Sequence, residues 1–410
     1  MIPRGAPYIG WADLFAATAH TLFPGNARAA QQRVEALWAP NTVASLSVRS
    51  GLDAMLQVFD FPAGSEIIVS AITIPHIVDI LAHHRLVAVP VDIDLATLSV
   101  DADDVRAAIT HRTKAILVAH LFGSRMPLDE IIAIAREHSL LLIEDCAQAN
   151  DGTSYRGHAE STVSMFSFGS IKRQTALGGG LLRFKETELA ERVRAKLATY
   201  PRQSRTAYSQ RVMTMAGVKL VASRPVFRFF VAYCRFRGWD HDKTLGTALR
   251  AFGKGDLFAR LRQQPSVSLL RVLERRLRQS AAESVAERVA VVEAVTSEFP
   301  ELNRPGADAE HHTHWLFPML TPEPEALMRS LWAKGFDATC GASNLVSVKA
   351  PVGKVVPEQA ERLMAEVMYL PLCPSVSERE MQEMAHAVRD LESVLELMRV
   401  RGADTSLRQG

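Results

Sequence analysis

Short apolar runs alternate with helical patterns between about Val43 and Phe184. The runs EIIVS (66–70), AILVA (115–119) and LLLIE (140–144) predict buried strands. Segments 101–109 and 128–138 carry apolar residues at helical spacing, and Asp101 is a favoured N-cap type. Strands separated by such helices predict βαβ units on a mainly parallel sheet that is buried on both faces.

Beyond Glu186 the pattern becomes mostly helical. Residues 188–198 predict one helix, and 266–295 predict a single long helix. A second α/β pattern follows, with HWLFPML (314–320) as a strand, 323–334 as a helix and 377–398 as a terminal helix. We therefore expect a large α/β domain with an N-terminal arm (1–184), a basic helical insertion (185–265), and a linker helix with a smaller α/β domain (266–410).

Composition narrows the class of protein. The chain has 410 residues, with 47 Lys and Arg against 45 Asp and Glu, which argues against a general nucleic-acid binder. Its four cysteines form no CxxC pair, so neither a disulfide framework nor a cysteine-rich zinc site is supported. The first residues lack an apolar signal-peptide core, and no apolar run reaches the ~20 residues of a membrane span. We expect a cytoplasmic protein.

Candidate chemistry begins at a predicted helix start, Ser50-Gly51-Leu52. Backbone N–H groups at a helix N-terminus hold phosphate well, although serine there is also an ordinary capping residue. A second candidate is Asp145, in Glu144-Asp145-Cys146-Ala147-Gln148 after the strand LLLI. A carboxylate at that place can hold a protonated ring nitrogen, and a plain helix cap is the alternative.

The third candidate is Lys172, in the loop SFGSIK between two predicted strands. A lysine in a buried cleft has a lowered pKa and forms Schiff bases, whereas a surface lysine would be the ordinary alternative. Gly178-Gly179-Gly180 follows and indicates close backbone approach, unusual dihedral angles or a loose turn. Together the three segments offer phosphate anchoring, a ring-nitrogen partner and an amine, which is what pyridoxal 5'-phosphate requires.

These motifs resemble the DegT/StrS family of sugar aminotransferases, which have the fold type I aminotransferase architecture. The resemblance runs through SGLDAM, GSEIIVSAIT, VPVDIDLATLSVD, AITHRTKAILVAHLFG, LLIEDCAQA and FSFGSIK, and resumes at YLPLCPSVSEREM near the C-terminus. It covers about half of the chain, and the stretch from about Lys185 to Arg262 matches nothing in it.

The resemblance implies roles for individual residues. Lys172 would form the Schiff base with pyridoxal phosphate and carry the proton, and Asp145 would face the pyridinium nitrogen. Gln148 would contact the ring or its hydroxyl, and Ser167 would donate to the phosphate together with the backbone at Ser50-Gly51-Leu52. The resemblance also implies a homodimer, with glutamate or a similar amino donor and a keto sugar nucleotide as acceptor.

The sequence departs from the family pattern at several places. Leu52 replaces a threonine, and Ile74 stands where an aromatic residue usually stacks on the cofactor, so His76 is an alternative stacking residue. Arg173 follows the lysine in place of asparagine, and Gly178 replaces a glutamate. Arg173 and Arg202 are candidates for a substrate diphosphate. The tight HHTH cluster (311–314) is more typical of packing or turn chemistry than of a metal site, so we predict no metal.

A basic block interrupts an otherwise mildly acidic chain. Residues 201–262 hold 13 Lys and Arg against three acids, which is +10, and the remainder is −8. Residues 213–239 mix these cations with six aromatic residues. Such a mixture suits an interfacial helix on anionic lipid, and a helical hairpin packed on the body or across a dimer is the alternative.

Three functions stay open on the sequence. The leading one is amino transfer to a keto sugar nucleotide, with a lipid-linked or acylated ketone at the inner membrane face as another acceptor class. A different pyridoxal-phosphate reaction, such as dehydration of a keto sugar, is the second. The third is a cofactor-binding relative with a regulatory or scaffold role and no catalysis.

Overall fold

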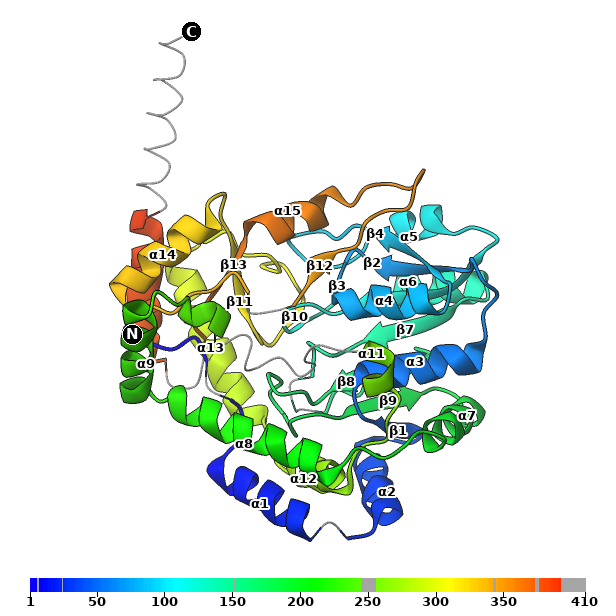
Figure 1. The fold of residues 1–410 in the computed structure, drawn as a ribbon. Coiled ribbons are helices and arrows are strands. Elements are labelled where there is room, and N and C mark those ends of the chain that lie inside the picture. Colours follow the sequence, from blue (N-terminus) through cyan, green and yellow to red (C-terminus); the bar gives the residue numbers. More distant parts are fainter. Residues whose placement is uncertain are drawn as a thin grey trace.

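The structure is a computed structural model that describes residues 1–5, 7–23, 25–150, 152, 154–244, 256–341, 344–372 and 376–391. Its centre is a seven-stranded sheet (Figure 1). In spatial order the strands are β1 (Thr42–Ser45), β9 (Gly180–Phe184), β8 (Val163–Ser167), β7 (Leu141–Asp145), β5 (Thr113–Ala119), β2 (Glu66–Ser70) and β4 (Val87–Val91). Only β9 runs antiparallel to its neighbours β1 and β8. The predicted mainly parallel sheet is confirmed.

Helices cover both faces of this sheet. Ile67 and Val69 of β2 pack on one side with α3 (Val48–Phe59), α4 (Pro75–His83), α7 (Thr187–Ala198) and the short α11 (Leu257–Leu261). Ile68 points to the opposite side, toward α5 (Ala102–Ala108), α6 (Asp129–Glu137) and α15 (Glu358–Glu366). This alternation explains why the strands read as continuous apolar runs. Asp101 caps α5 by accepting from the backbone of Asp103 and Asp104, as predicted.

The C-terminal part forms a smaller α/β layer. β11 (Phe317–Leu320) pairs with β13 (Val367–Leu370), and α14 (Pro324–Lys334) packs beside them. Two short pairings join this part to the large sheet region, namely β10 (His311–His312) with β6 (Ser124–Arg125), and β12 (Val346–Ser347) with β3 (Ile72–Thr73). These pairings bring C-terminal residues to the carboxyl ends of the central strands.

The single helix predicted over 266–295 is wrong. The structure has α12 (Val267–Leu277) and α13 (Ala282–Glu298), separated by residues 278–281. The two helices serve different cores, because Leu269 and Leu273 pack in the N-terminal cluster while Val292 and Val295 pack in the C-terminal one. Of the predicted helix 377–398, residues 378–391 are helical and the rest lies outside the described residues.

Within the basic block (201–262) the structure describes the helices α8 (Arg205–Val221) and α9 (Arg224–Phe236), besides the short α11. One side of α8 is buried against α12 and the N-terminal helix α1 (Trp11–Leu22), with Tyr208, Val212 and Met215 in the same cluster as α2 (Ala27–Trp38). The alternative in which this block packs on the body agrees with the burial of α8, although Figure 1 shows α9 turning away from α8 at a steep angle. No helix in the described part of the chain is long and apolar enough to cross a bilayer.

Candidate active site

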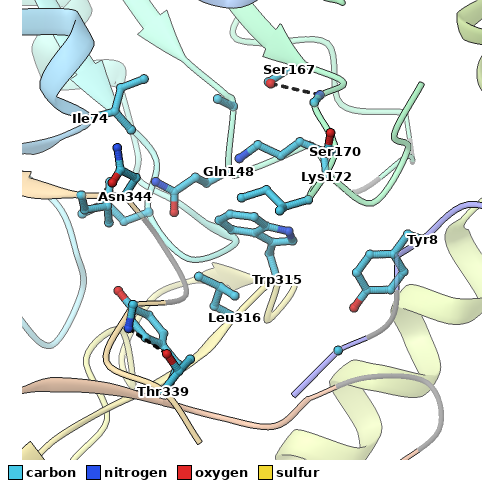
Figure 2. Close-up of a pocket in the computed structure, with 18 of the residues that line it drawn as sticks. Tyr8, Ile74, Gln148, Ser167, Ser170, Lys172, Trp315, Leu316, Thr339 and Asn344 are labelled. Atoms are coloured by element: carbon cyan, nitrogen blue, oxygen red, sulfur yellow. Dashed lines mark hydrogen bonds between the residues drawn. The ribbon is translucent and has the colours of Figure 1, made fainter. Parts of the chain in front are cut away.

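A cavity of about 410 Å³ opens at the carboxyl ends of the central strands, where open α/β sheets bind ligands (Figure 2). Five of the residues predicted from the sequence line it: His76, Asp145, Gln148, Ser167 and Lys172. They come from separate segments that only the sheet brings together. Ile74, which replaces the expected aromatic residue, lines the same cavity.

The triple glycine holds the Lys172 loop against the start of α3. Gly178 and Gly179 have φ of +155° and +97°, which residues with side chains rarely adopt. A Cβ on Gly180 would lie 2.5 Å from the backbone nitrogen of Val48, so only glycine permits this approach. Both unusual dihedral angles and close backbone approach are therefore present, and together they bring the lysine loop and a helix N-terminus to one cavity.

Lys172 extends into the cavity with its Nζ 3.9 Å from the centre of the Trp315 ring (Figure 2). Burial lowers the pKa of Lys172 to about 7. The negative charge of Asp145 opposes this shift, and the positive charge of Arg49 adds to it. A lysine with this pKa is partly a neutral amine near physiological pH, which is the form that acts as a nucleophile or base.

Asp145 and Glu144 leave the end of β7 on opposite sides. Asp145 lines the cavity and accepts from the backbone N–H of Ala147 at 2.9 Å. Burial raises the pKa of Asp145, against the effects of that hydrogen bond and of Lys172. A cationic N–H group in front of this carboxylate would stabilise its charged form.

Glu144 instead anchors a buried polar network behind the cavity. It accepts from Ser164 Oγ at 2.7 Å, from the backbone of His158 at 2.9 Å and from Tyr155, and pairs with His120 Nε2 at 3.0 Å. Burial favours a raised pKa, but these donors, led by His120, lower the pKa of Glu144 below its ordinary value. The side chains of His120, Glu144 and Cys146 cluster within 4.8 Å. The partners of Glu144 make this cluster a structural support for the strand ends.

Gln148 and Ser167 are held by backbone contacts. Gln148 Oε1 accepts from the backbone N–H of Phe122 at 3.0 Å, which fixes the direction of the amide. Ser167 ends β8 and accepts from Gly169 at 3.5 Å.

The phosphate contact was predicted at Ser50, Gly51 and Leu52, but the residues of α3 that line the cavity lie about one helical turn earlier. Helix α3 begins at Val48, and the cavity touches Ser47, Val48 and Arg49. Leu52 is buried in the core, and a Cβ on Gly51 would lie 2.3 Å from Leu182 Cδ1. The glycine therefore allows α3 to pack tightly on β9, and the cavity end of the helix belongs to the three residues before Ser50.

Arg49 was not predicted and is the cation at this helix end. Its Nη1 lies 2.7 Å from His76 Nδ1. Burial and the charge of Arg211 lower the pKa of Arg49 to about 10, so it stays charged at neutral pH. Burial, followed by Arg49, lowers the pKa of His76. His76 thus reaches the cavity as a partner of Arg49.

Arg173, predicted to bind substrate, is not among the residues that line the cavity. Its Nη2 donates to the carbonyl of Ser284 at 2.6 Å, and its guanidinium lies 5.5 Å from the Tyr8 ring. Arg202 donates to the carbonyl of Pro265 at 2.9 Å, also outside the cavity lining. The rings of His312 and His314 stack 4.1 Å apart near the predicted strand entrance.

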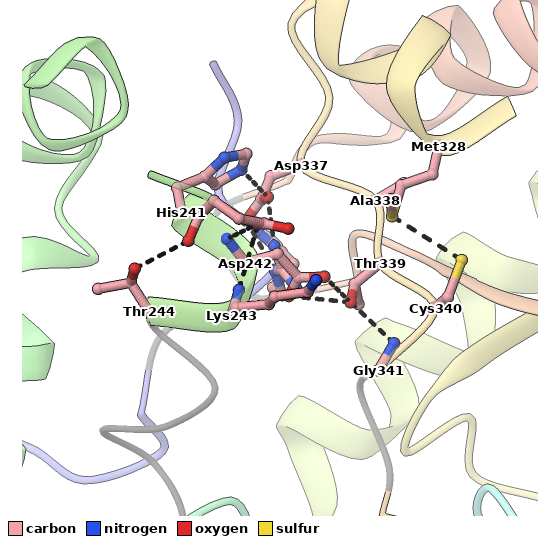
Figure 3. Close-up of polar contacts among 12 residues, drawn as sticks. His241, Asp242, Lys243, Thr244, Met328, Asp337, Ala338, Thr339, Cys340 and Gly341 are labelled. Atoms are coloured by element: carbon pink, nitrogen blue, oxygen red, sulfur yellow. Dashed lines mark hydrogen bonds and ion pairs between the residues drawn. The ribbon is translucent and has the colours of Figure 1, made fainter. Parts of the chain in front are cut away.

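A charged network forms the rim of the cavity beside the basic block (Figure 3). Arg4 pairs with Asp337 at 2.6 Å and with Asp242, and Thr339 Oγ1 donates to Asp242 at 2.9 Å. His241 Nε2 lies 3.1 Å from Asp337. Arg4, Asp242 and Thr339 line the cavity. Two carboxylates therefore neutralise much of the charge that Arg4 brings to it.

Several lining residues escaped sequence reasoning because they are far from the motifs. Tyr8 lies in the N-terminal arm, and Trp315 lies in HWLFPML, which was interpreted only as a strand. Val218 and Ala222 come from α8 and the residue that follows it. The one local sign that these residues line a site was the position of Trp315, which directly follows a cluster of histidines at the start of a predicted strand.

Comparison with known proteins identifies the motif-bearing region. Residues 29–220 match the DegT/DnrJ/EryC1/StrS aminotransferase family. Over these residues the chain is similar to this family, and the match spans a little less than half of the chain. The match contains α3, the Asp145 strand and the Lys172 loop, so the site residues described above lie mainly within it.

Two curated relatives match shorter segments. An L-glutamine:2-deoxy-scyllo-inosose aminotransferase of Streptomyces lividus is 45% identical over 26% of this chain and 26% of its own length. A pleiotropic regulatory protein of Geobacillus stearothermophilus is 38% identical over 35% of this chain and 41% of its own length. The chain thus aligns with less than half of either relative.

Solved structures match the whole fold. The aminotransferase TlmJ of Streptoalloteichus hindustanus superposes with a TM-score of 0.69 at 21% identity, covering 96% of this chain and 100% of its own. Helicobacter pylori PseC, an aminotransferase involved in the biosynthesis of pseudoaminic acid, has a TM-score of 0.69 at 16% identity, covering 96% and 99%. These structures have the fold type I aminotransferase architecture, which confirms the predicted fold class.

Proposed function

We propose that this protein is a pyridoxal-phosphate-dependent aminotransferase that moves an amino group from a donor such as glutamate to a carbonyl acceptor. The observation that carries the proposal is that Lys172 and Asp145 line the same cavity. Burial lowers the pKa of Lys172 to about 7, while Asp145 presents a buried carboxylate. The match of residues 29–220 to the DegT/DnrJ/EryC1/StrS aminotransferase family supports it.

The donor set fits the cofactor. The N-terminus of α3, Arg49 and Ser167 would hold the phosphate, because a helix dipole and a buried cation favour an anion there. Asp145 would hold the ring nitrogen, and Lys172 would hold the aldehyde carbon. When bound, pyridoxal phosphate supplies an electron sink for the carbon that loses its proton.

Lys172 carries the proton in this proposal. Its neutral amine would take the proton from the donor's α-carbon and pass it to the carbon that carried the aldehyde. With the acceptor it would move a proton in the opposite direction, so one residue would act as base and then as acid in each half of the reaction. Asp145 stays ionised opposite a cationic N–H group. The Trp315 ring packs against the Lys172 amine and excludes water from it.

For the acceptor we propose a keto sugar nucleotide. Among the solved structures, DesI was determined in the presence of its TDP-sugar product, with a TM-score of 0.67 at 19% identity. A homodimer that adds residues to the site is part of this proposal. Dehydration of a keto sugar with the same cofactor is the competing reaction, and retention of Lys172 favours amino transfer over it.

A second acceptor class is a lipid-linked or acylated ketone. Apolar side chains from several separate segments line the cavity, among them Val218, Leu316, Leu345 and Leu372. Arg4 is paired with two carboxylates. This part of the wall would accommodate an apolar chain, which is why this acceptor class stands second.

The experiment is spectroscopic. Purified protein mixed with pyridoxal phosphate should give a visible absorbance band that L-glutamate bleaches as the amino form accumulates. Lys172→Ala should lose the band, and Lys334→Ala, an exposed lysine on α14, should keep it. A protein that neither binds the cofactor nor responds to any amino donor would overturn the proposal. Cofactor binding without a response would favour the regulatory role.

A further inference from the structure

Helix α9 carries two apolar stripes on opposite faces. Phe227, Val231 and Cys234 are at most 4% exposed and face the body of the protein. Phe229, Tyr233 and Phe236 repeat the same spacing two residues later and are 78%, 51% and 86% exposed. A helix on a protein surface needs only the first stripe. The second stripe places three aromatic rings in solvent, where each is unfavourable unless something covers it.

Arginines accompany the exposed aromatic stripe. Arg228 and Arg235 each precede one of its phenylalanines and are exposed, as is Arg237 in the turn that follows. Arg237 lies 5.1 Å from the Trp239 ring, and Trp239 meets Tyr233 edge-on at 6.0 Å. The sequence has no Asp or Glu between Glu191 and Asp240. We call Phe229, Tyr233, Phe236, Trp239, Arg228, Arg235 and Arg237 the α9 face.

The chemistry of the α9 face selects its partner. Rings that enter an apolar layer and guanidiniums that remain at its charged boundary match an anionic lipid surface, which offers acyl chains beneath phosphates. Arg224, at the start of α9, is instead engaged by Glu380 at 2.7 Å. The cations of the α9 face therefore carry the attraction.

The α9 face is also connected to the cavity. Helix α8, which leads into α9, contributes Val218 to the cavity wall, and Asp242, which follows α9, is part of its rim (Figure 3). One helical hairpin thus has a cavity side and an outward side. A protein held by the outward side would have its cavity wall anchored close to the lipid surface.

We propose that the α9 face docks this protein on the surface of an anionic lipid bilayer. The helix lies along the surface with Phe229, Tyr233 and Phe236 below the headgroups and the arginines at the level of the phosphates. The docking does not depend on the proposed aminotransferase activity, because it requires neither cofactor nor substrate.

The test is co-sedimentation of the full chain with vesicles of phosphatidylcholine, with and without phosphatidylglycerol. Arg228→Gln/Arg235→Gln should lower partitioning onto anionic vesicles roughly 25-fold, since each cation near such a surface contributes a factor of about five. Phe229→Ser/Phe236→Ser should lower partitioning at least tenfold, because burial of even one phenylalanine ring contributes about that factor. These residues are exposed, so the variants keep the folded core.

Two control variants remove exposed arginines and exposed apolar side chains outside the α9 face. Arg106→Gln/Arg136→Gln removes two exposed arginines from α5 and α6, and Val352→Ser/Val355→Ser removes two exposed apolar side chains from the loop before α15. Both controls should bind like the wild type.

Three results would overturn the proposal. The first is wild-type protein found only in the supernatant with anionic vesicles, and the second is a loss of binding in the controls as large as that in the α9 variants. Alternatively, light scattering could show that Phe229→Ser/Phe236→Ser converts a dimer to a monomer while vesicle binding is unchanged, which would make the α9 face a contact between copies. Retained cofactor absorbance in these variants would show that the proposed active site is intact in each case.

Discussion

The low pKa of Lys172 has a consequence for folding that is measurable without any substrate. In the unfolded chain this lysine has its ordinary pKa of about 10.4. In the folded protein burial lowers the pKa to about 7. Between these values the unfolded state binds a proton that the folded state lacks, so the free energy of unfolding must rise with pH. The destabilisation that comes from the lowered pKa of Lys172 is complete below pH 7 and disappears above the pKa of the unfolded chain.

The size of the effect follows from proton linkage. From pH 7 to pH 9 the unfolded chain keeps the proton on Lys172, while the folded protein goes from half-protonated to almost fully neutral. Integration gives a gain in the free energy of unfolding of about 2 kcal/mol for the cofactor-free protein. Lys172→Met removes the titrating group, so this variant should lack that gain and should be more stable than the wild type at pH 7.

The assay is urea unfolding of cofactor-free protein at pH 7 and pH 9, for the wild type, Lys172→Met and Lys334→Met. The difference between wild type and Lys172→Met cancels the titration of all other groups. Lys334 is exposed on α14, and its variant should keep the pH dependence of the wild type. Equal pH dependence in wild type and Lys172→Met would refute the buried, neutral amine and with it the assigned proton carrier.

Three further predictions concern the support of the site. Gly51→Ala places a Cβ 2.3 Å from Leu182 Cδ1, so urea unfolding should show a loss of about 2 kcal/mol. Glu144→Ala leaves its buried donors unpaired and should cost about 3 kcal/mol at pH 7 by the same measurement. Because the pKa of Glu144 is lowered on folding, its contribution is present above pH ~4.5 and is lost as the pH falls below that value, so wild type and variant should converge in acid. Arg49→Gln should weaken pyridoxal-phosphate binding about tenfold in a fluorescence titration, and unchanged affinity would remove Arg49 from the phosphate site.

Local patterns predicted much of the large sheet and the order of its chemistry. The strands β2, β5 and β7 are buried on both faces, which requires continuous apolar runs. Such runs can be recognised in the sequence without knowing which strands pair. The same patterns placed Asp145 at a strand end and Lys172 in the loop before β9. They could not show that α12 and α13 separate, because helical periodicity says nothing about which core each helix faces.

The sequence by itself determined the strands, the helices around them and the presence of a lysine and a carboxylate where parallel strands end. Only the tertiary structure decided that Arg49 rather than Gly51 meets the cavity, that Arg173 turns toward Ser284, and that Tyr8 and Trp315 complete the walls. Periodicity is a property of neighbouring residues, whereas a cavity is formed by side chains hundreds of residues apart whose positions depend on how the layers pack.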